Sequence, residues 1–252
     1  MVDTRRFHGA ARPRDTGKGR LPFDILYEDD DYIAIDKPAG LLSVHTALHG
    51  RFARESQRTA ENILTDYLRK GQAKSSKKAW IVHRLDRETS GAMIFAKSRE
   101  MAEAIRENWS AATEKTYIAK VEGFLDAKSG VFESYLAEND DGYRVRSVPA
   151  RRNGAPPANA KFARTRWREI GRTRRCTMVE VKLDTGRKNQ IRVHFAEAGH
   201  PVSGDVKYGG RKADCLCLHS SELRFMNPRT RRWTSVTARA PAWFSSGDGP
   251  CG

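Results

Sequence analysis

One stretch of this sequence is more informative than any other: His83-Arg84-Leu85-Asp86-Arg87-Glu88-Thr89-Ser90-Gly91. Apolar residues dominate on both sides of its centre, over 79–86 and 91–98. These runs predict two strands joined by a short polar turn at 87–90. Turns between strands often carry function, because the strands hold the loop rigidly at the protein surface.

Asp86 is the candidate for chemistry within this turn. It lies between Arg84 and Arg87, and nearby cations favour a charged carboxylate. A carboxylate of this kind is suited to act as a nucleophile or an electrostatic stabiliser rather than as a general acid. An ordinary structural turn is the alternative, since Asp, Thr, Ser and Gly are all common turn residues.

The segments further out alternate between strand and helix patterns. Period-two alternation predicts further strands at 31–38, 117–123 and 176–184. The predicted helices are 56–70, capped by Ser56 and followed by Gly71; a helix after Ser98 with Met101, Ile105 and Trp109 on one face; and 187–198, closed by Gly199.

The charge of the chain indicates its partner. Its 252 residues include 46 Lys and Arg against 31 Asp and Glu, a net charge of +15, which is typical of proteins that bind a polyanion. Fourteen basic residues and three acidic ones fall between Arg144 and Lys188. Because guanidinium groups bind phosphate and stack on bases, we expect this Arg-rich stretch to contact nucleic acid.

Several classes of protein are excluded by what the sequence lacks. No apolar run approaches the roughly 18 residues of a membrane-spanning helix, and residues 1–20 lack the apolar core of a signal peptide. Four cysteines are too few for a disulfide framework. Neither of the two glycine-rich phosphate-binding motifs, the P-loop and the Rossmann-type turn from a strand into a helix, occurs. We expect a cytoplasmic protein with a disordered basic arm at 1–20, one domain at 21–244 and a flexible tail at 245–252.

The motifs, taken together, resemble the RluA-type pseudouridine synthases. HRLDRETSG follows that family's pattern H-R-L-D-x-x-T-S-G. In chain order, the other matching blocks are YEDDDYIAIDKPAGLLSVH (27–45), with the K-P-x-G loop; Lys115-Thr116-Tyr117, similar to K-x-Y; LDTGRKNQIRVHFAEAGHPVSGDVKYGG (183–210), similar to T-G-R-x-H-Q-x-R-x-H and G-H-P-x-x-G-D-x-x-Y-G; and the closing segments 218–230 and 240–243. Several blocks in family order are far more specific than one motif.

The resemblance implies a fold and an activity. The fold is a mixed α/β (α+β) pseudouridine synthase domain, with a mainly antiparallel central sheet and flanking helices around an active-site cleft. The activity is the isomerisation of specific uridines to pseudouridine in ribosomal RNA, in tRNA or in both, by base flipping and with neither cofactor nor metal. Only some 20 residues precede the opening strand, so we expect a short form without the N-terminal RNA-binding domain, acting as a monomer.

The resemblance also implies roles for individual residues. Asp86 matches the catalytic Asp, and Tyr117 matches the Tyr that packs against the uracil. Arg192 matches the Arg that pairs with the catalytic Asp, and Arg84 matches the Arg that fills the gap left by the flipped base. The other substrate-binding positions that it implies are His83, Lys188, Gln190 and Leu218.

One position departs from the family pattern. Asn189 stands where the family usually has His, beside Gln190. We expect this side chain to support the start of the helix or to touch RNA. Lys188 lies one helical turn before Arg192, so one helix face is expected to meet both Asp86 and a phosphate.

Other functions have weaker support from the residues. An RNA-binding protein with this fold but no catalysis would have no reason to keep Asp86, Tyr117 and Arg192 together. A carboxylate-based glycosidase needs a second catalytic carboxylate, for which Glu88 is the nearest candidate. The candidate metal ligands, His83 with Asp86, or His194, His200 and Asp205, lack the spacing of known metal motifs.

Overall fold

The computed structural model describes residues 21–45, 58–72, 74–139, 142, 144–149, 155–156 and 158–245. The predicted basic arm at 1–20 and residues 246–252 of the predicted tail lie outside these residues. The elements in chain order are β1 (Ile25–Glu28), β2 (Tyr32–Lys37), α1 (Ala60–Arg69), β3 (Trp80–Ile81), β4 (Ser90–Ala96), α2 (Arg99–Glu107), α3 (Trp109–Ala112), β5 (Thr113–Glu122), β6 (Ser129–Glu138), β7 (Val145–Val148), β8 (Lys161–Arg172), β9 (Cys176–Leu183), α4 (Gln190–Glu197), η1 (Val206–Tyr208), β10 (Leu218–Met226), β11 (Trp233–Thr237) and α5 (Ala242–Ser245).

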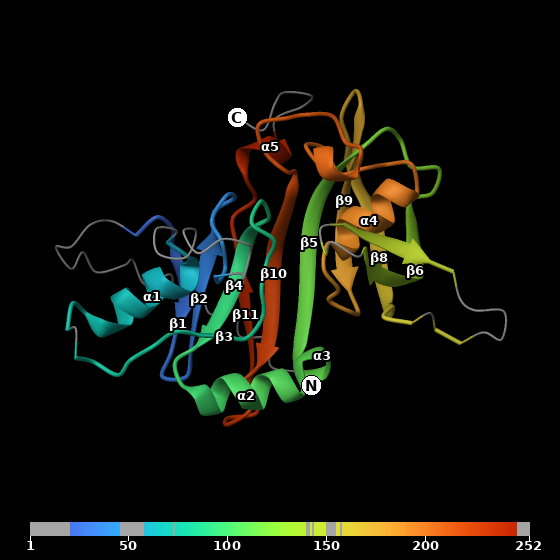
Figure 1. Ribbon diagram of the computed structural model, residues 1–252. Coiled ribbons are helices and arrows are strands. Elements are labelled where there is room, and N and C mark those ends of the chain that lie inside the picture. The colour runs from blue at the N-terminus through green and yellow to red at the C-terminus, as the bar shows by residue number, and fades with distance from the viewer. Residues whose placement is uncertain are drawn as a thin grey trace, which may run out of the picture.

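A single large sheet spans the described residues (Figure 1). Its order is β1-β2-β4-β10-β5-β9-β8-β6-β7, with β11 paired to β10 and β3 paired to β4. Among these strands only β4 and β10 run parallel, with Ser90 beside His219, and every other pair is antiparallel. The expected α+β fold with a mainly antiparallel sheet is confirmed.

The sheet is apolar on both faces because its central strands alternate between two cores. In β2, Ile33 and Ile35 point into one cluster while Tyr32 and Ala34 point into the other. Successive side chains of a strand face opposite sides of a sheet, so the two clusters lie on opposite faces.

Different helices cover the two faces. The apolar sides of α1 and α4 pack into the cluster of Ile33 and Ile35, which also contains Tyr117 of β5. The apolar side of α2 packs into the cluster of Tyr32 and Ala34. In Figure 1, α4 lies against the β8–β9 part of the sheet, and α1 lies near β1 and β2. None of the helices in the described ranges is long and apolar enough to cross a membrane.

The strand predictions succeed except around Asp86. The strands at 31–38, 117–123 and 176–184 are confirmed as β2, β5 and β9, although β5 begins earlier, at Thr113. Of the strand predicted at 79–86 only Trp80–Ile81 is confirmed, as β3, and residues 82–89 form an irregular loop. Side chains replace the ladder there: the imidazole Nε2 of His83 accepts the backbone N–H of Ile94 at 3.1 Å.

The helix predictions hold in place but differ at the ends. Ser56 lies outside the described residues, and the cap of α1 is Thr59, whose hydroxyl accepts the Asn62 N–H. Ser98 caps α2 as predicted, but Trp109 belongs to the separate helix α3. The last predicted helix begins at Gln190 rather than at 187, because Asn189 has a left-handed backbone with φ of 54° that interrupts helical geometry.

Candidate active site

The loop that carries Asp86 is fastened on both sides of that residue. The hydroxyl of Ser43 donates to the Leu85 carbonyl at 2.9 Å and accepts the Leu85 N–H at 3.2 Å. On the other side, the Arg87 carbonyl accepts the Gly40 N–H at 2.9 Å and the ammonium of Lys37 at 3.0 Å. The segment after β2 therefore fixes the backbone that presents Asp86.

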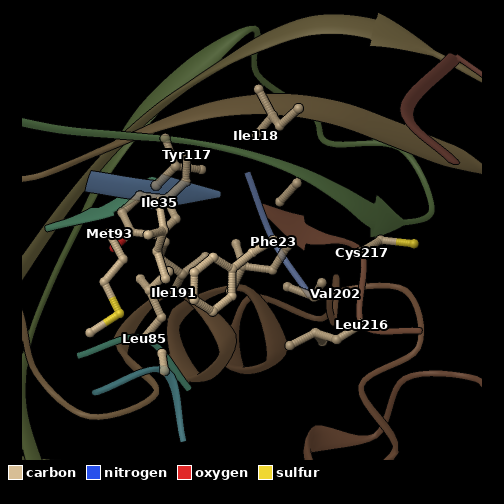
Figure 2. Packing of buried hydrophobic residues seen from close by; sticks show 14 of the residues in the cluster. Phe23, Ile35, Leu85, Met93, Tyr117, Ile118, Ile191, Val202, Leu216 and Cys217 are labelled. Atoms are coloured by element: carbon tan, nitrogen blue, oxygen red, sulfur yellow. The ribbon is translucent and has the colours of Figure 1, made fainter. Parts of the chain in front are cut away.

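Apolar packing brings the distant parts of the site together. Figure 2 shows Leu85, Ile191 and Tyr117 in one cluster with Ile35 and Met93. Leu85 precedes Asp86 and Ile191 precedes Arg192 in the sequence. Burying these two apolar neighbours positions the carboxylate and the guanidinium above the sheet face that carries Tyr117.

The Asp86 carboxylate accepts two hydrogen bonds on the same oxygen. Its Oδ2 accepts from Asn189 Nδ2 at 2.6 Å and from Arg192 Nη1 at 3.3 Å. Its Oδ1 accepts no hydrogen bond from the described residues, and the side chain is 25 % exposed. One oxygen is thus held in place, while the other has no hydrogen-bond donor among the described residues.

Arg192 is itself held by a buried carboxylate. Asp205, whose side chain is fully buried, accepts from Arg192 Nε at 2.6 Å and from Nη2 at 2.7 Å. The guanidinium also lies 5.1 Å from the ring centre of Tyr208. Burial acts to lower the pKa of Arg192, but the hydrogen bonds and charge of Asp205, with those of Asp86, outweigh it and raise that pKa. Arg192 is therefore a permanent cation shared between two carboxylates.

Asn189 was missed as a partner of Asp86. Its amide neither caps α4 nor faces outward, since Asn189 is 8 % exposed and makes no side-chain cap hydrogen bond. Its Oδ1 accepts from Tyr208 Oη at 3.0 Å and from Lys207 Nζ at 3.2 Å. The departure from the family pattern was the signal in the sequence, but it did not indicate what the side chain touches.

Tyr117 lies on β5, 7 % exposed, in the cluster beneath the site. Burial, and after it the charge of Asp86, raises the pKa of the phenol, while a hydrogen bond with Ser220 acts in the opposite direction. The phenol is therefore protonated at neutral pH. Leu218 lies on β10, opposite Ala119 of β5. It is buried and belongs to the same apolar cluster as Tyr117.

The arginines next to Asp86 in the sequence are not its partners in space. Arg87 donates to the Gly40 carbonyl at 3.1 Å and lies 3.6 Å from Glu88, the candidate second carboxylate. Arg84 is exposed and forms no ion pair with the described residues. The cation that pairs with Asp86 is Arg192, at 3.3 Å.

Two of the predicted substrate-binding residues, His83 and Gln190, contact other side chains and backbone groups of the protein. The ring of His83 stacks on Trp109 at 4.8 Å, and burial, with the charge of Lys115, lowers its pKa to about 3. Gln190 is 2 % exposed, and its amide bonds Arg164, Thr165, Thr185 and Arg187. Both side chains have internal partners, and their contact with substrate stays a prediction.

Lys188 is also placed differently from the prediction. It precedes α4, and its ammonium bonds Glu138 at 2.7 Å and the Gly142 carbonyl at 2.6 Å. The prediction of one helix face shared with Arg192 is wrong, because the helix starts after the left-handed Asn189. Lys188 instead joins the end of β6 to the start of α4.

Several arginines of the Arg-rich stretch form ion pairs with acidic side chains of the protein. On β8, Arg164 pairs with Glu133 and Asp184, Arg166 with Asp184, Arg168 with Glu180 and Arg172 with Glu169. The last of these pairs lies within β8, and the others lie on the face of the sheet that points away from α4, since Ala163, Thr165 and Trp167 between them are buried. These arginines are less available to RNA than the sequence indicated.

Metal ligands are not gathered anywhere in the described ranges. No group of three His, Cys, Asp or Glu side chains there is arranged to hold a metal ion. His194 bonds Thr165 and Ser134, and Asp205 bonds Arg192. The groups that the structure does gather around Asp86 are the guanidinium of Arg192 and the amide of Asn189.

Comparison with known proteins gives consistent matches. The family model described as RNA pseudouridylate synthase matches residues 31–197. An RNA pseudouridine synthase of Bacillus subtilis (strain 168) is 34% identical over 223 residues, which is 87% of this chain and 69% of the relative. The tRNA pseudouridine synthase C of Haemophilus ducreyi is 31% identical, covering 86% of this chain and 91% of the relative.

A third relative is the ribosomal large subunit pseudouridine synthase C of Vibrio parahaemolyticus, 31% identical over 85% of this chain and 64% of its own length. Among solved structures, human RNA pseudouridylate synthase domain containing 4 superposes with a TM-score of 0.68, at 23% identity, over 88% of this chain and 90% of that one. The structural likeness extends over the sheet and its helices and supports the fold.

Proposed function

The chain belongs to the RNA pseudouridylate synthase family, whose members isomerise uridine in RNA to pseudouridine, and we propose that Asp86 performs this chemistry here. The single observation that supports this role is the asymmetry of its carboxylate. Oδ2 is held by Asn189 and Arg192, while Oδ1 faces no donor among the described residues. A preorganised anion with one open oxygen is suited to attack the ribose or to remove a sugar proton.

The reaction requires no co-reactant. The bond between ribose C1′ and uracil N1 breaks, the freed uracil turns, and a bond between C1′ and uracil C5 forms. C5 loses its proton and N1 gains one, so the product is an isomer of the substrate. Tyr117 packs against the uracil in this proposal, and Leu218 contributes to the apolar wall beside it.

The target base must leave its stack before it reaches Asp86, at a cost of a few kcal/mol. Arg84 is the proposed replacement for the flipped base. Its guanidinium is exposed, adjacent to the site in the sequence and not bound to any described acid. A flat cation that forms hydrogen bonds and stacks is suited to fill the gap in an RNA helix.

The partner is RNA, and we propose ribosomal RNA, tRNA or both as the substrate. The relative from Vibrio parahaemolyticus is named for the ribosomal large subunit and the one from Haemophilus ducreyi for tRNA, and a net charge of +15 suits either polyanion. We further propose that residues 21–244 form the catalytic domain and that it works as a monomer in the cytoplasm, where these RNAs mature. A carboxylate-based glycosidase is disfavoured, since Glu88 lies beside Arg87 on the exposed side of the loop.

The deciding experiment maps pseudouridines by carbodiimide chemistry in RNA from cells with and without the gene. Cells are rescued with the wild type or with Asp86→Asn, which keeps the shape of the side chain. We expect one or a few sites to disappear and to return only with the wild type. In parallel, the purified protein should release tritium from C5-tritiated transcripts. Turnover by Asp86→Asn at the wild-type rate would overturn the assignment.

A further inference from the structure

We infer that Asn189 is a positioning residue, whose amide orients the Asp86 carboxylate so that Oδ1 is the reacting oxygen; this inference rests on the proposed role of Asp86. The distance of 2.6 Å from Asn189 Nδ2 to Asp86 Oδ2 is the shorter of the two contacts at that oxygen. Arg192 supplies charge from 3.3 Å, whereas the amide supplies direction.

The orientation of the amide follows from its other partners. Lys207 Nζ can only donate, so the atom of Asn189 that faces it at 3.2 Å must be the oxygen. The amide nitrogen then necessarily faces Asp86. Reversing the amide would set its oxygen against the carboxylate and its N–H₂ against an ammonium, so the observed arrangement is strongly preferred.

The backbone supports the same function. Asn189 adopts φ of 54°, a left-handed conformation that Asn tolerates better than most residues with a side chain. This conformation turns its side chain away from the start of α4, where an Asn would ordinarily cap the helix. The amide is thus available to Asp86, and this residue connects the 183–188 turn to the catalytic loop.

Tyr208 extends the arrangement to the outer strands. Its hydroxyl donates to Asn189 Oδ1 at 3.0 Å and accepts the Val145 N–H of β7 at 3.1 Å. A continuous path therefore runs from β7 through Tyr208 and Asn189 to Asp86. The ring of Tyr208 also supports the Arg192 guanidinium, so both donors to Asp86 depend on one tyrosine.

The test compares Asn189→Gly, Asn189→Asp and Tyr208→Phe in the full chain, using single-turnover tritium release from a C5-tritiated transcript. Glycine keeps the left-handed backbone while removing the amide. We expect its turnover to fall about ten- to a hundred-fold, the range for loss of a hydrogen bond to a charged group. RNA affinity and melting temperature should stay close to those of the wild type.

The other variants separate positioning from simple support of the fold. Asn189→Asp has the same shape but sets a second carboxylate against Asp86, so the acid limb of its pH–rate profile should move to higher pH. Tyr208→Phe should have a smaller effect, and in the double variant with Asn189→Gly it should add nothing further. The matched control is Asn159→Gly, an exposed left-handed Asn with φ of 59°, which should leave turnover unchanged.

Two outcomes would overturn the inference. One is turnover within about two-fold of the wild type for Asn189→Gly. The other is a loss of turnover matched by an equal loss of folded protein, with an unmoved pH profile for Asn189→Asp. Failure of the proposed function is separate, because it would appear as activity of Asp86→Asn or as inactivity of the wild type.

Discussion

The ammonium of Lys37 donates a hydrogen bond of 3.0 Å to the carbonyl of Arg87, the residue that follows Asp86. Lys37 is completely buried at the end of β2, and it also donates to the carbonyls of Pro38 and Leu41. A buried charge is tolerated only where its donors are satisfied, and here three carbonyls satisfy them. The lysine therefore shapes the loop after β2 and joins it to the loop that carries Asp86.

Replacing this lysine should cost both stability and activity. Lys37→Met keeps the length of the side chain but leaves buried carbonyls without their donor, at about 1–3 kcal/mol. We expect a lower free energy of unfolding in urea and slower tritium release. Lys97→Met is the control: that lysine is partly exposed and pairs with Glu28, so its loss should cost less than about 1 kcal/mol.

The difference in stability between the wild type and Lys37→Met should also depend on pH. Burial lowers the pKa of Lys37 from its ordinary value of 10.5 to about 8, against the charges of Glu88 and Asp86, which raise it. Between these values the unfolded chain binds the proton and the folded chain does not, so stability rises with pH. The wild type should therefore gain stability relative to Lys37→Met from about pH 8 to 10.5. A flat difference across that window would contradict the buried charge.

Loss of the Asp205 charge should lower the free energy of unfolding more than loss of a carboxylate near the surface. Asp205→Asn leaves the buried Arg192 guanidinium without its main counter-charge, a change worth about 3–5 kcal/mol. Denaturant unfolding should show this loss, and turnover should fall because Arg192 also contacts Asp86. Asp184→Asn removes a half-buried partner of the exposed Arg164 and Arg166 and should cost less than about 1 kcal/mol. Equal losses in the two variants would refute the distinction.

Arg84 should matter only when a base has to leave a helix. Arg84→Ala is expected to lower turnover at least about ten-fold on a uridine stacked in a folded RNA, where unstacking costs a few kcal/mol. On a single-stranded oligonucleotide the effect should largely vanish. Arg87→Ala, which loosens the loop at Gly40, should instead slow both substrates by a similar factor. The ratio between the two substrates is the measurement that decides the role of Arg84.

The salt dependence of RNA binding should distinguish unpaired from paired arginines. Arg146 is exposed on β7, next to Val145, and forms no ion pair with the described residues, whereas Arg168 is bound to Glu180. Arg146→Gln should reduce the slope of log affinity against log salt by about 0.7–0.9, the value of one phosphate contact. Arg168→Gln should leave it almost unchanged. Binding measured with Asp86→Asn protein avoids turnover during the titration.

Local patterns predicted elements wherever packing agreed with them. The alternation in 31–38 and 176–184 is present in β2 and β9, and Ser98 caps α2, because burial and capping depend on residues close in sequence. The strand predicted at 79–86 ends early because the Ser43 hydroxyl bonds the N–H and carbonyl of Leu85, and because the side chain of His83, not its backbone, bonds the N–H of Ile94 on β4. No local sequence pattern indicates these side-chain hydrogen bonds.

The sequence by itself indicated the polyanionic partner through its charge, and the fold class and the candidates Asp86, Tyr117 and Arg192 through its resemblance to a known family, which the ordered motifs carry. The tertiary structure alone decided their partners. Asn189 and Arg192 lie 103 and 106 residues from Asp86, and they meet it because Leu85 and Ile191 are buried in one core. It also gave His83, Gln190 and the β8 arginines internal partners. Which polar groups pair depends on strand register and on where α4 begins, and no single segment of sequence contains that information.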